Sequence, residues 1–153
     1  MLMRVINPHH LKFHYKDFCP YCRRVDKYIL TPLEEMGIIV VERCDIEDFL
    51  VGKDLAANRR IGKAFGKPKG LAPLVLDVSC TDSLGAIRYY WVPHNYGSRR
   101  DQITRSIREV AVNLIDHLCK TVKVEDSDGE KRYLSQNDVM RNEIIKKLMR
   151  DII

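Results

Sequence analysis

The sequence lacks most of the features that mark membrane, secreted or disordered proteins. Its longest apolar runs, residues 37–41 and 71–76, are far shorter than the roughly 20 residues that cross a bilayer. The amino terminus has neither the apolar stretch nor the cleavage site of a secretory signal, and no repeat or low-complexity segment is present. With 45% hydrophobic and 31% charged residues, the chain is expected to be soluble, globular and cytoplasmic, with no membrane partner.

The cysteines are too few, and odd in number, for the disulfide framework of a small secreted protein. They are Cys19, Cys22, Cys44, Cys80 and Cys119. A structural zinc site would need a second Cys/His pair at short spacing. The nearest such pair is His117 and Cys119, which lie two residues apart in a predicted helix and therefore face different directions. This favours a catalytic role for Cys19 and Cys22, and roles as small core or surface residues for the other three.

The net charge of +5 and the pI near 9.0 favour anionic partners, among them glutathione, nucleotides, nucleic acid and acidic proteins. The basic residues are spread along the chain, so a solvated surface explains them equally well. Three consecutive aromatics, Tyr89, Tyr90 and Trp91, must point to both faces of a strand and so form no stacking platform for bases. We therefore do not expect a nucleic-acid partner.

From residue 11 to about residue 121, hydrophobic periodicity gives the order strand, helix, strand, helix, strand, strand, helix. The predicted strands are residues 11–16, 38–44, 71–78 and 86–92, and the predicted helices are residues 20–36, 52–65 and 98–121. Pro20 fits the first turn of the first helix, Pro32 lies inside it and can kink it, and Gly37 supplies its end. Residues 1–121 are thus expected to form one α/β domain.

The last 32 residues differ in character from this domain. Residues 122–134 predict a hairpin that turns at Asp128 and Gly129. Beyond them, Met140, Ile144 and Leu148 recur at the spacing of one helix face. Residues 122–153 are therefore expected to form an extension, a hairpin plus a helix, that packs on or flanks the first domain.

A Cys-x-x-Cys pair at a junction between strand and helix has a clear chemical logic. The first sulfur, that of Cys19, would lie at the helix amino terminus, where unpaired N–H groups stabilise a thiolate. Cys22 would lie one turn further and could resolve a mixed disulfide, while Lys16 would add positive charge. The alternatives are half of a zinc site or two inert buried thiols. The strand before the pair and the amphipathic helix after it disfavour both.

The stretch Lys-Asp-Phe-Cys-Pro-Tyr-Cys at residues 16–22 resembles the dithiol active site of the glutaredoxin family, Lys-x-x-Cys-Pro-Tyr-Cys. Residues 71–73 resemble the family's Thr-Val-Pro, and residues 97–101 resemble its Gly-Gly-x-x-Asp. The resemblance covers roughly residues 11–120. It implies a thioredoxin-like fold, with a four-stranded mixed sheet and helices on both of its faces, here followed by the hairpin and helix.

The resemblance also implies roles for individual residues in binding glutathione. Pro73 would be cis, and the backbone of Ala72 would pair with a bound cysteine-containing peptide. Ser98 and Asp101 would hold the γ-glutamyl end, and Tyr21 would flank the sulfurs.

The glycine carboxylate of glutathione would need a cation from the second helical region. Arg59, Arg60, Lys63 and Lys67 are all candidates, and Arg60 is our choice among them.

The implied activity is reduction of protein or glutathione mixed disulfides, with glutathione as the reducing co-substrate and no metal. Clients would be disulfide-containing proteins, of which ribonucleotide reductase is a family expectation. The departures at Leu71, Ala72, Arg99 and Arg100 motivate an alternative, a thioredoxin-like enzyme recharged by a reductase. A third reading is a protein-binding module on a redoxin scaffold, in which the cysteines are vestigial.

Three histidines, His9, His10 and His14, lie close together just before the redox motif. A metal site among them is conceivable. The first two follow Pro8 in a predicted loop, and alternation puts His14 on the polar face of the strand. These positions favour surface roles over a metal site.

Overall fold

The computed structural model describes residues 4–17, 19–45, 73–81, 87–91, 99–136 and 138–152. For residues 81, 87–91 and 138 it describes the backbone alone. The expected helix at residues 52–65 lies outside the described residues, as do three of the expected glutathione contacts, Arg60, Ala72 and Ser98.

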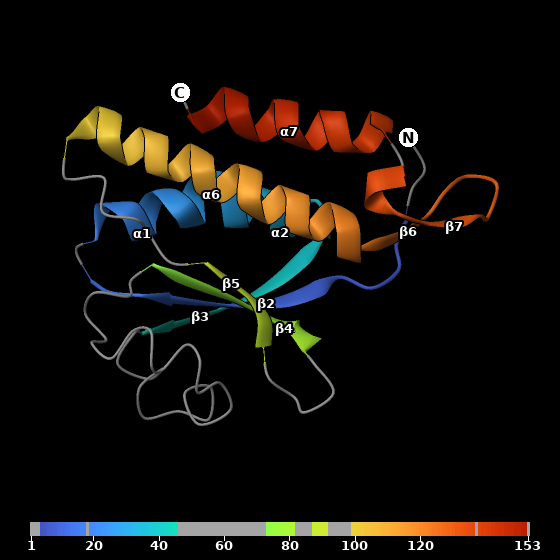
Figure 1. Ribbon diagram of the computed structural model, residues 1–153, viewed down its shortest axis with the longest axis horizontal. Coiled ribbons are helices and arrows are strands. Elements are labelled where there is room, and N and C mark those ends of the chain that lie inside the picture. The colour runs from blue at the N-terminus through green and yellow to red at the C-terminus, as the bar shows by residue number, and fades with distance from the viewer. Residues whose placement is uncertain are drawn as a thin grey trace.

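A mixed β-sheet forms the base of the molecule (Figure 1). Its strands are β2 (His9–Tyr15), β3 (Ile39–Asp45), β4 (Leu74–Thr81) and β5 (Ile87–Trp91). They lie in the order β3-β2-β4-β5, with β2 parallel to β3 and the other neighbours antiparallel. A parallel pair needs a crossover connection, which the first helical segment between β2 and β3 supplies. The expectation of an α/β protein with a mixed sheet is thus confirmed.

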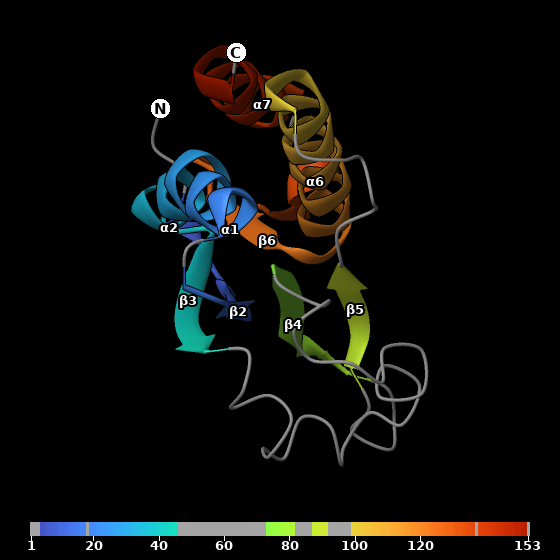
Figure 2. The same ribbon diagram turned by 90° about the vertical axis from the view of Figure 1, so that its left-hand side faces the viewer.

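The described helices all lie on one side of this sheet (Figures 1 and 2). They are α1 (Pro20–Val25), η1 (Asp26–Leu30), α2 (Thr31–Glu35), α6 (Arg100–Thr121) and α7 (Asp138–Ile152). The first three and α6 cover the sheet, and α7 lies over them as an outer layer. Within the described ranges, no helix has both the length and the apolar character needed to cross a bilayer.

The first helical segment contains a wide π turn instead of the single regular helix predicted from the sequence. The N–H of Thr31 donates to the carbonyl of Asp26, five residues back. Pro32 is the physical cause, because its nitrogen cannot donate and its ring crowds the preceding turn. The segment ends as predicted at Gly37, which has φ of 75° and is followed by the bond from the N–H of Ile38 to the carbonyl of Leu33.

The extension forms the predicted hairpin, from β6 (Lys123–Glu125) and β7 (Lys131–Tyr133). Its turn passes through Gly129, whose φ of 81° suits glycine. A short amino-terminal strand, β1 (Arg4–Val5), which the sequence did not predict, pairs antiparallel with β6 to complete a three-stranded sheet. The amino-terminal segment is therefore joined to the hairpin of the extension.

One continuous core runs from the sheet through α6 to α7. The predicted apolar face of α6 is buried, and its members are Ile103, Ile107, Val110, Leu114, Ile115 and Leu118. On α7, Ile144, Leu148 and Ile152 are buried in the same cluster. The hydrophobic effect thus fixes α7 on the helical layer, since exposing these side chains would cost about 2 kcal/mol each.

Candidate active site

Cys19 lies at the junction between β2 and α1, four residues after the strand ends at Tyr15. It is the N-cap residue of α1, with an extended backbone (φ −95°, ψ 112°), and Pro20 occupies the first turn. The backbone N–H of Cys22 donates to the Sγ atom of Cys19 over 3.2 Å. The sulfur therefore takes the place that a serine or aspartate oxygen usually has at a helix start.

Contacts around Cys19 lower the pKa of its thiol to about 6. The largest cause is a hydrogen bond from the side chain of Cys22; burial opposes it, and the backbone N–H groups of Cys22 and Tyr21 and the charge of Lys16 add to it. All of these except burial favour the charged form of the sulfur. At neutral pH, Cys19 is therefore mostly a thiolate.

The same contacts act on Cys22 in the opposite sense. Its pKa is raised well above that of an ordinary thiol, chiefly by its side-chain hydrogen bond to Cys19 and then by burial. Lys16 works against this rise, through a backbone hydrogen bond and through its charge. The pair thus divides into a nucleophilic thiolate and a thiol that keeps its proton.

Both cysteines are only 4% exposed, but both line a cavity of about 340 Å³. Phe13 and Tyr15 give this cavity an apolar part, and its charged lining is mixed, with Lys16, Arg23 and Arg43 beside Asp17 and Asp26. Among the described residues, this cavity is where a small molecule can approach the two sulfurs. The cavity thus offers a ligand an apolar part and charges of both signs.

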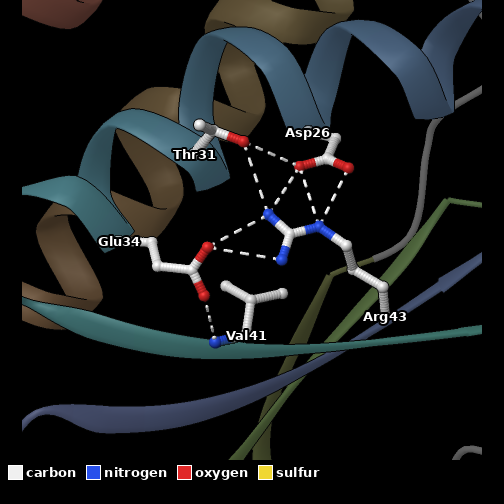
Figure 3. Close-up of polar contacts among 5 residues, drawn as sticks. All are labelled: Asp26, Thr31, Glu34, Val41 and Arg43. Atoms are coloured by element: carbon white, nitrogen blue, oxygen red, sulfur yellow. Dashed lines mark hydrogen bonds and ion pairs between the residues drawn. The ribbon is translucent and has the colours of Figure 1, made fainter.

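Arg43 forms one wall of the cavity and is held in a network of polar contacts (Figure 3). Its guanidinium donates to Asp26 over 2.9–3.1 Å and to Glu34 over 3.3 Å, which raises the pKa of Arg43, chiefly through the hydrogen bond to Asp26. The Thr31 hydroxyl donates to the Oδ1 atom of Asp26 over 3.0 Å. The carboxylate of Glu34 accepts the backbone N–H of Val41. The network therefore joins β3 to both ends of the π turn.

Sequence reasoning missed Asp26 and Arg43 as residues of this cavity. Asp26 lies on a helix and Arg43 on a strand, 17 positions apart, and neither belongs to a motif. A charge of opposite sign at each position is compatible with many surface arrangements. Only the packing of the helical segment on β3 shows that the two side chains meet.

The structure brings together three of the predicted site residues, Lys16, Cys19 and Cys22. Tyr21 lies two residues after Cys19 and is half-buried. Burial and the charge of Cys19 raise the pKa of Tyr21. Pro73 is buried just before β4, at the end of the sheet where β2 leads to Cys19, because Leu74 pairs with His14.

Asp101 lies elsewhere, in the exposed first turn of α6. It lines a separate hollow with Arg100, Thr104, Arg105 and Arg108 and makes a long ion pair with Arg99 (3.5 Å). The described residues therefore do not place Asp101 in the cavity that Cys19 and Cys22 line.

Two groups of described residues place three or more ligand atoms close enough to share a metal ion. One consists of His9, Asp77 and His117 in the interior, and the other of the acidic side chains at 126, 128 and 130 in the hairpin turn. Neither group contains Cys19 or Cys22.

Comparison of the chain with models of protein families, with curated proteins and with solved structures gave no match.

Proposed function

We propose that the protein is a glutaredoxin-like thiol–disulfide oxidoreductase with a thioredoxin-like fold. The observation that carries the proposal is the contrast within the cysteine pair. Cys19 caps a helix with its pKa lowered to about 6, and Cys22, three residues on, has its pKa raised. Such a contrast is what a nucleophile and a resolving thiol require.

The order of the described elements supports the fold part of this proposal. A strand, the helical segment that Cys19 begins and a parallel strand come first, followed by two antiparallel strands and α6. The helix expected at residues 52–65, for the other face of the sheet, stays a prediction from the sequence. The resemblance of residues 16–22 to the glutaredoxin motif points to the same fold.

The reaction would proceed in two exchanges. The Cys19 thiolate attacks one sulfur of a disulfide R–S–S–R′, forms the mixed disulfide Cys19–S–S–R and releases R′S⁻, which takes up a proton. Cys22 then loses its proton and attacks the Sγ atom of Cys19, which releases RS⁻ and leaves a Cys19–Cys22 disulfide. Two electrons have passed from the dithiol to the substrate. Two glutathione molecules would restore the dithiol and become glutathione disulfide.

The geometry gives this sequence of steps a built-in order. The charge and hydrogen bond of the Cys19 thiolate are what hold the proton on Cys22, apart from burial. Both disappear when Cys19 enters a mixed disulfide, while the influence of Lys16, which favours a Cys22 thiolate, remains. Cys22 therefore becomes a nucleophile only after the first exchange has taken place.

Glutathione is the proposed co-substrate because residues 16–22 resemble the glutaredoxin motif. The cavity supports the choice, since it sets the cations of Lys16 and Arg23, together with Asp17, beside apolar side chains. Glutathione carries two carboxylates, which such cations can bind. The contacts expected from Arg60, Ala72, Pro73 and Ser98 belong to this proposal, whereas Asp101 lines a separate hollow and does not. Disulfide-containing client proteins, ribonucleotide reductase among them, and a cytoplasmic location also belong to the proposal.

The test is reduction of hydroxyethyl disulfide with glutathione as the electron source. We expect turnover by the wild type, none by Cys19→Ser, and unchanged turnover by Cys44→Ser, a cysteine outside the cavity lining. Turnover that needs thioredoxin reductase and ignores glutathione would identify the thioredoxin-like alternative instead. No turnover with either donor would refute the enzyme assignment and favour a binding module.

A further inference from the structure

A second polar cluster lies in the interior, built from three distant parts of the chain. His9 begins β2, Asp77 lies in β4, and His117 lies near the end of α6. The Nδ1 atom of His9 and the Nε2 atom of His117 are each 2.6 Å from the same Oδ2 atom of Asp77. All three possible ligand atoms lie within 4.8 Å of one another.

The cluster is enclosed and its carboxylate is held in place. Asp77 is 0% exposed, and the side chains of His9 and His117 are 6% and 12% exposed. The other carboxylate oxygen of Asp77 accepts the backbone N–H of Ser79 over 3.0 Å, and the Ser79 hydroxyl accepts the N–H of His10 over 2.8 Å. These bonds orient Oδ2 toward the two rings, as outer partners orient the ligands of a metal site.

We propose that His9, Asp77 and His117 bind one divalent transition-metal ion of the zinc type. Two imidazoles and one carboxylate are a set that zinc accepts, with water as the fourth ligand. The nitrogen ligands disfavour calcium and magnesium, which prefer oxygen. Tetrahedral bonds of about 2.1 Å would separate neighbouring ligand atoms by about 3.4 Å, so each ring would move less than 1 Å away from Asp77.

The ion would join β2, β4 and α6 at the end of the sheet far from the cysteines. His9 and Tyr15 are the two ends of β2, a span of about 20 Å for seven residues. The site is therefore independent of the thiol chemistry, and its role would be to fix α6 on the sheet. The sequence places His9 beside His10 and His14, whereas the residues that share its site are Asp77 and His117, 68 and 108 positions further along the chain.

The experiment is a Co²⁺ titration of the full-length Cys19→Ser/Cys22→Ser variant, because the active-site thiols would themselves bind the probe. We expect one ion per chain, with d–d absorption bands and no sulfur-to-cobalt charge-transfer band. His9→Gln and His117→Gln keep a hydrogen-bond donor for Asp77 and should weaken binding at least tenfold. His10→Gln, an exposed neighbour outside the cluster, should bind as the parent does.

Imidazole ¹⁵N NMR spectra with added Zn²⁺ test the site without any change to its ligands. The signals of His9 and His117 should shift in a 1:1 titration, while those of His10 and His14 stay in place. The proposal is wrong if the parent variant binds no Co²⁺, if both glutamine variants bind as tightly as the parent does, or if Zn²⁺ leaves His9 and His117 unshifted.

Discussion

Replacing Cys22 with alanine should raise the pKa of Cys19 substantially, because the Cys22 side chain is the largest single cause that lowers it. A hydrogen bond to a charged group contributes about 1.5–3 kcal/mol, which corresponds to roughly 1–2 pKa units. The pKa of Cys19, about 6 in the wild type, should therefore rise to roughly 7–8 in Cys22→Ala. Cys22→Ser keeps an O–H donor and should change it by less than Cys22→Ala does.

The assay is the rate of alkylation by iodoacetamide between pH 4 and 10, followed on the Cys19 peptide by mass spectrometry. The midpoint of this profile is more informative than the rate at pH 7. A low pKa ionises more of the thiol but also weakens its nucleophilicity, with a Brønsted coefficient of about 0.4–0.5. Relative to a thiol with a pKa of about 8.5, the net gain is about twofold at pH 7 and roughly 20-fold at pH 5.5.

Lys16→Gln is a useful third variant, because Lys16 lowers the pKa of Cys19 through its charge and ranks below the two Cys22 hydrogen bonds. The midpoint of the alkylation profile should rise by less in Lys16→Gln than in Cys22→Ala. The reasoning fails if the wild-type midpoint lies near 8.5, or if Cys22→Ala and Cys22→Ser give the same midpoint as the wild type.

Three further predictions concern stability. Leu148→Ala, at a fully buried position of α7, should lower the free energy of unfolding in urea by about 2–5 kcal/mol. Val139→Ala, at a 57% exposed position of the same helix, should change it by less than about 0.5 kcal/mol. Equal effects would mean that α7 is not packed on the core. Asp77 has its pKa lowered from 3.8 to about 2, so the stability it contributes, roughly 2 kcal/mol, is present above pH 3.8 and is lost as the pH falls to about 2. Urea unfolding at pH 5 and pH 2.5 should show this loss in the wild type and a smaller loss in Asp77→Asn; the same loss in both would contradict the assignment. Arg43→Met should lower the free energy of unfolding by about 1 kcal/mol. It should also make thermal unfolding less sensitive to salt, because the partners Asp26 and Glu34 are about one-third exposed and salt screens such ion pairs. Unchanged salt sensitivity would show that the network does not contribute to stability.

Local chemistry made much of the architecture predictable from the sequence. The alternation of residues 11–16 and the three-and-four spacing of apolar residues in α6 depend only on the geometry of a strand and of a helix. The hairpin turn at Gly129 follows from the tolerance of glycine for positive φ. The position of Cys19 at a helix start follows from Pro20 and the strand before it. Each of these features is fixed by neighbours in the chain.

Contacts that join distant segments of the chain could not be predicted from the sequence. The pairing of β1 with β6, the network of Arg43 with Asp26, and the meeting of His9, Asp77 and His117 all depend on how complete elements pack. A single polar residue on a strand or helix does not indicate which residue it will contact, because periodicity predicts which face of an element is buried and not which element packs against it. The sequence by itself therefore determined the elements and the cysteine pair, and the tertiary structure decided which charges and rings would meet.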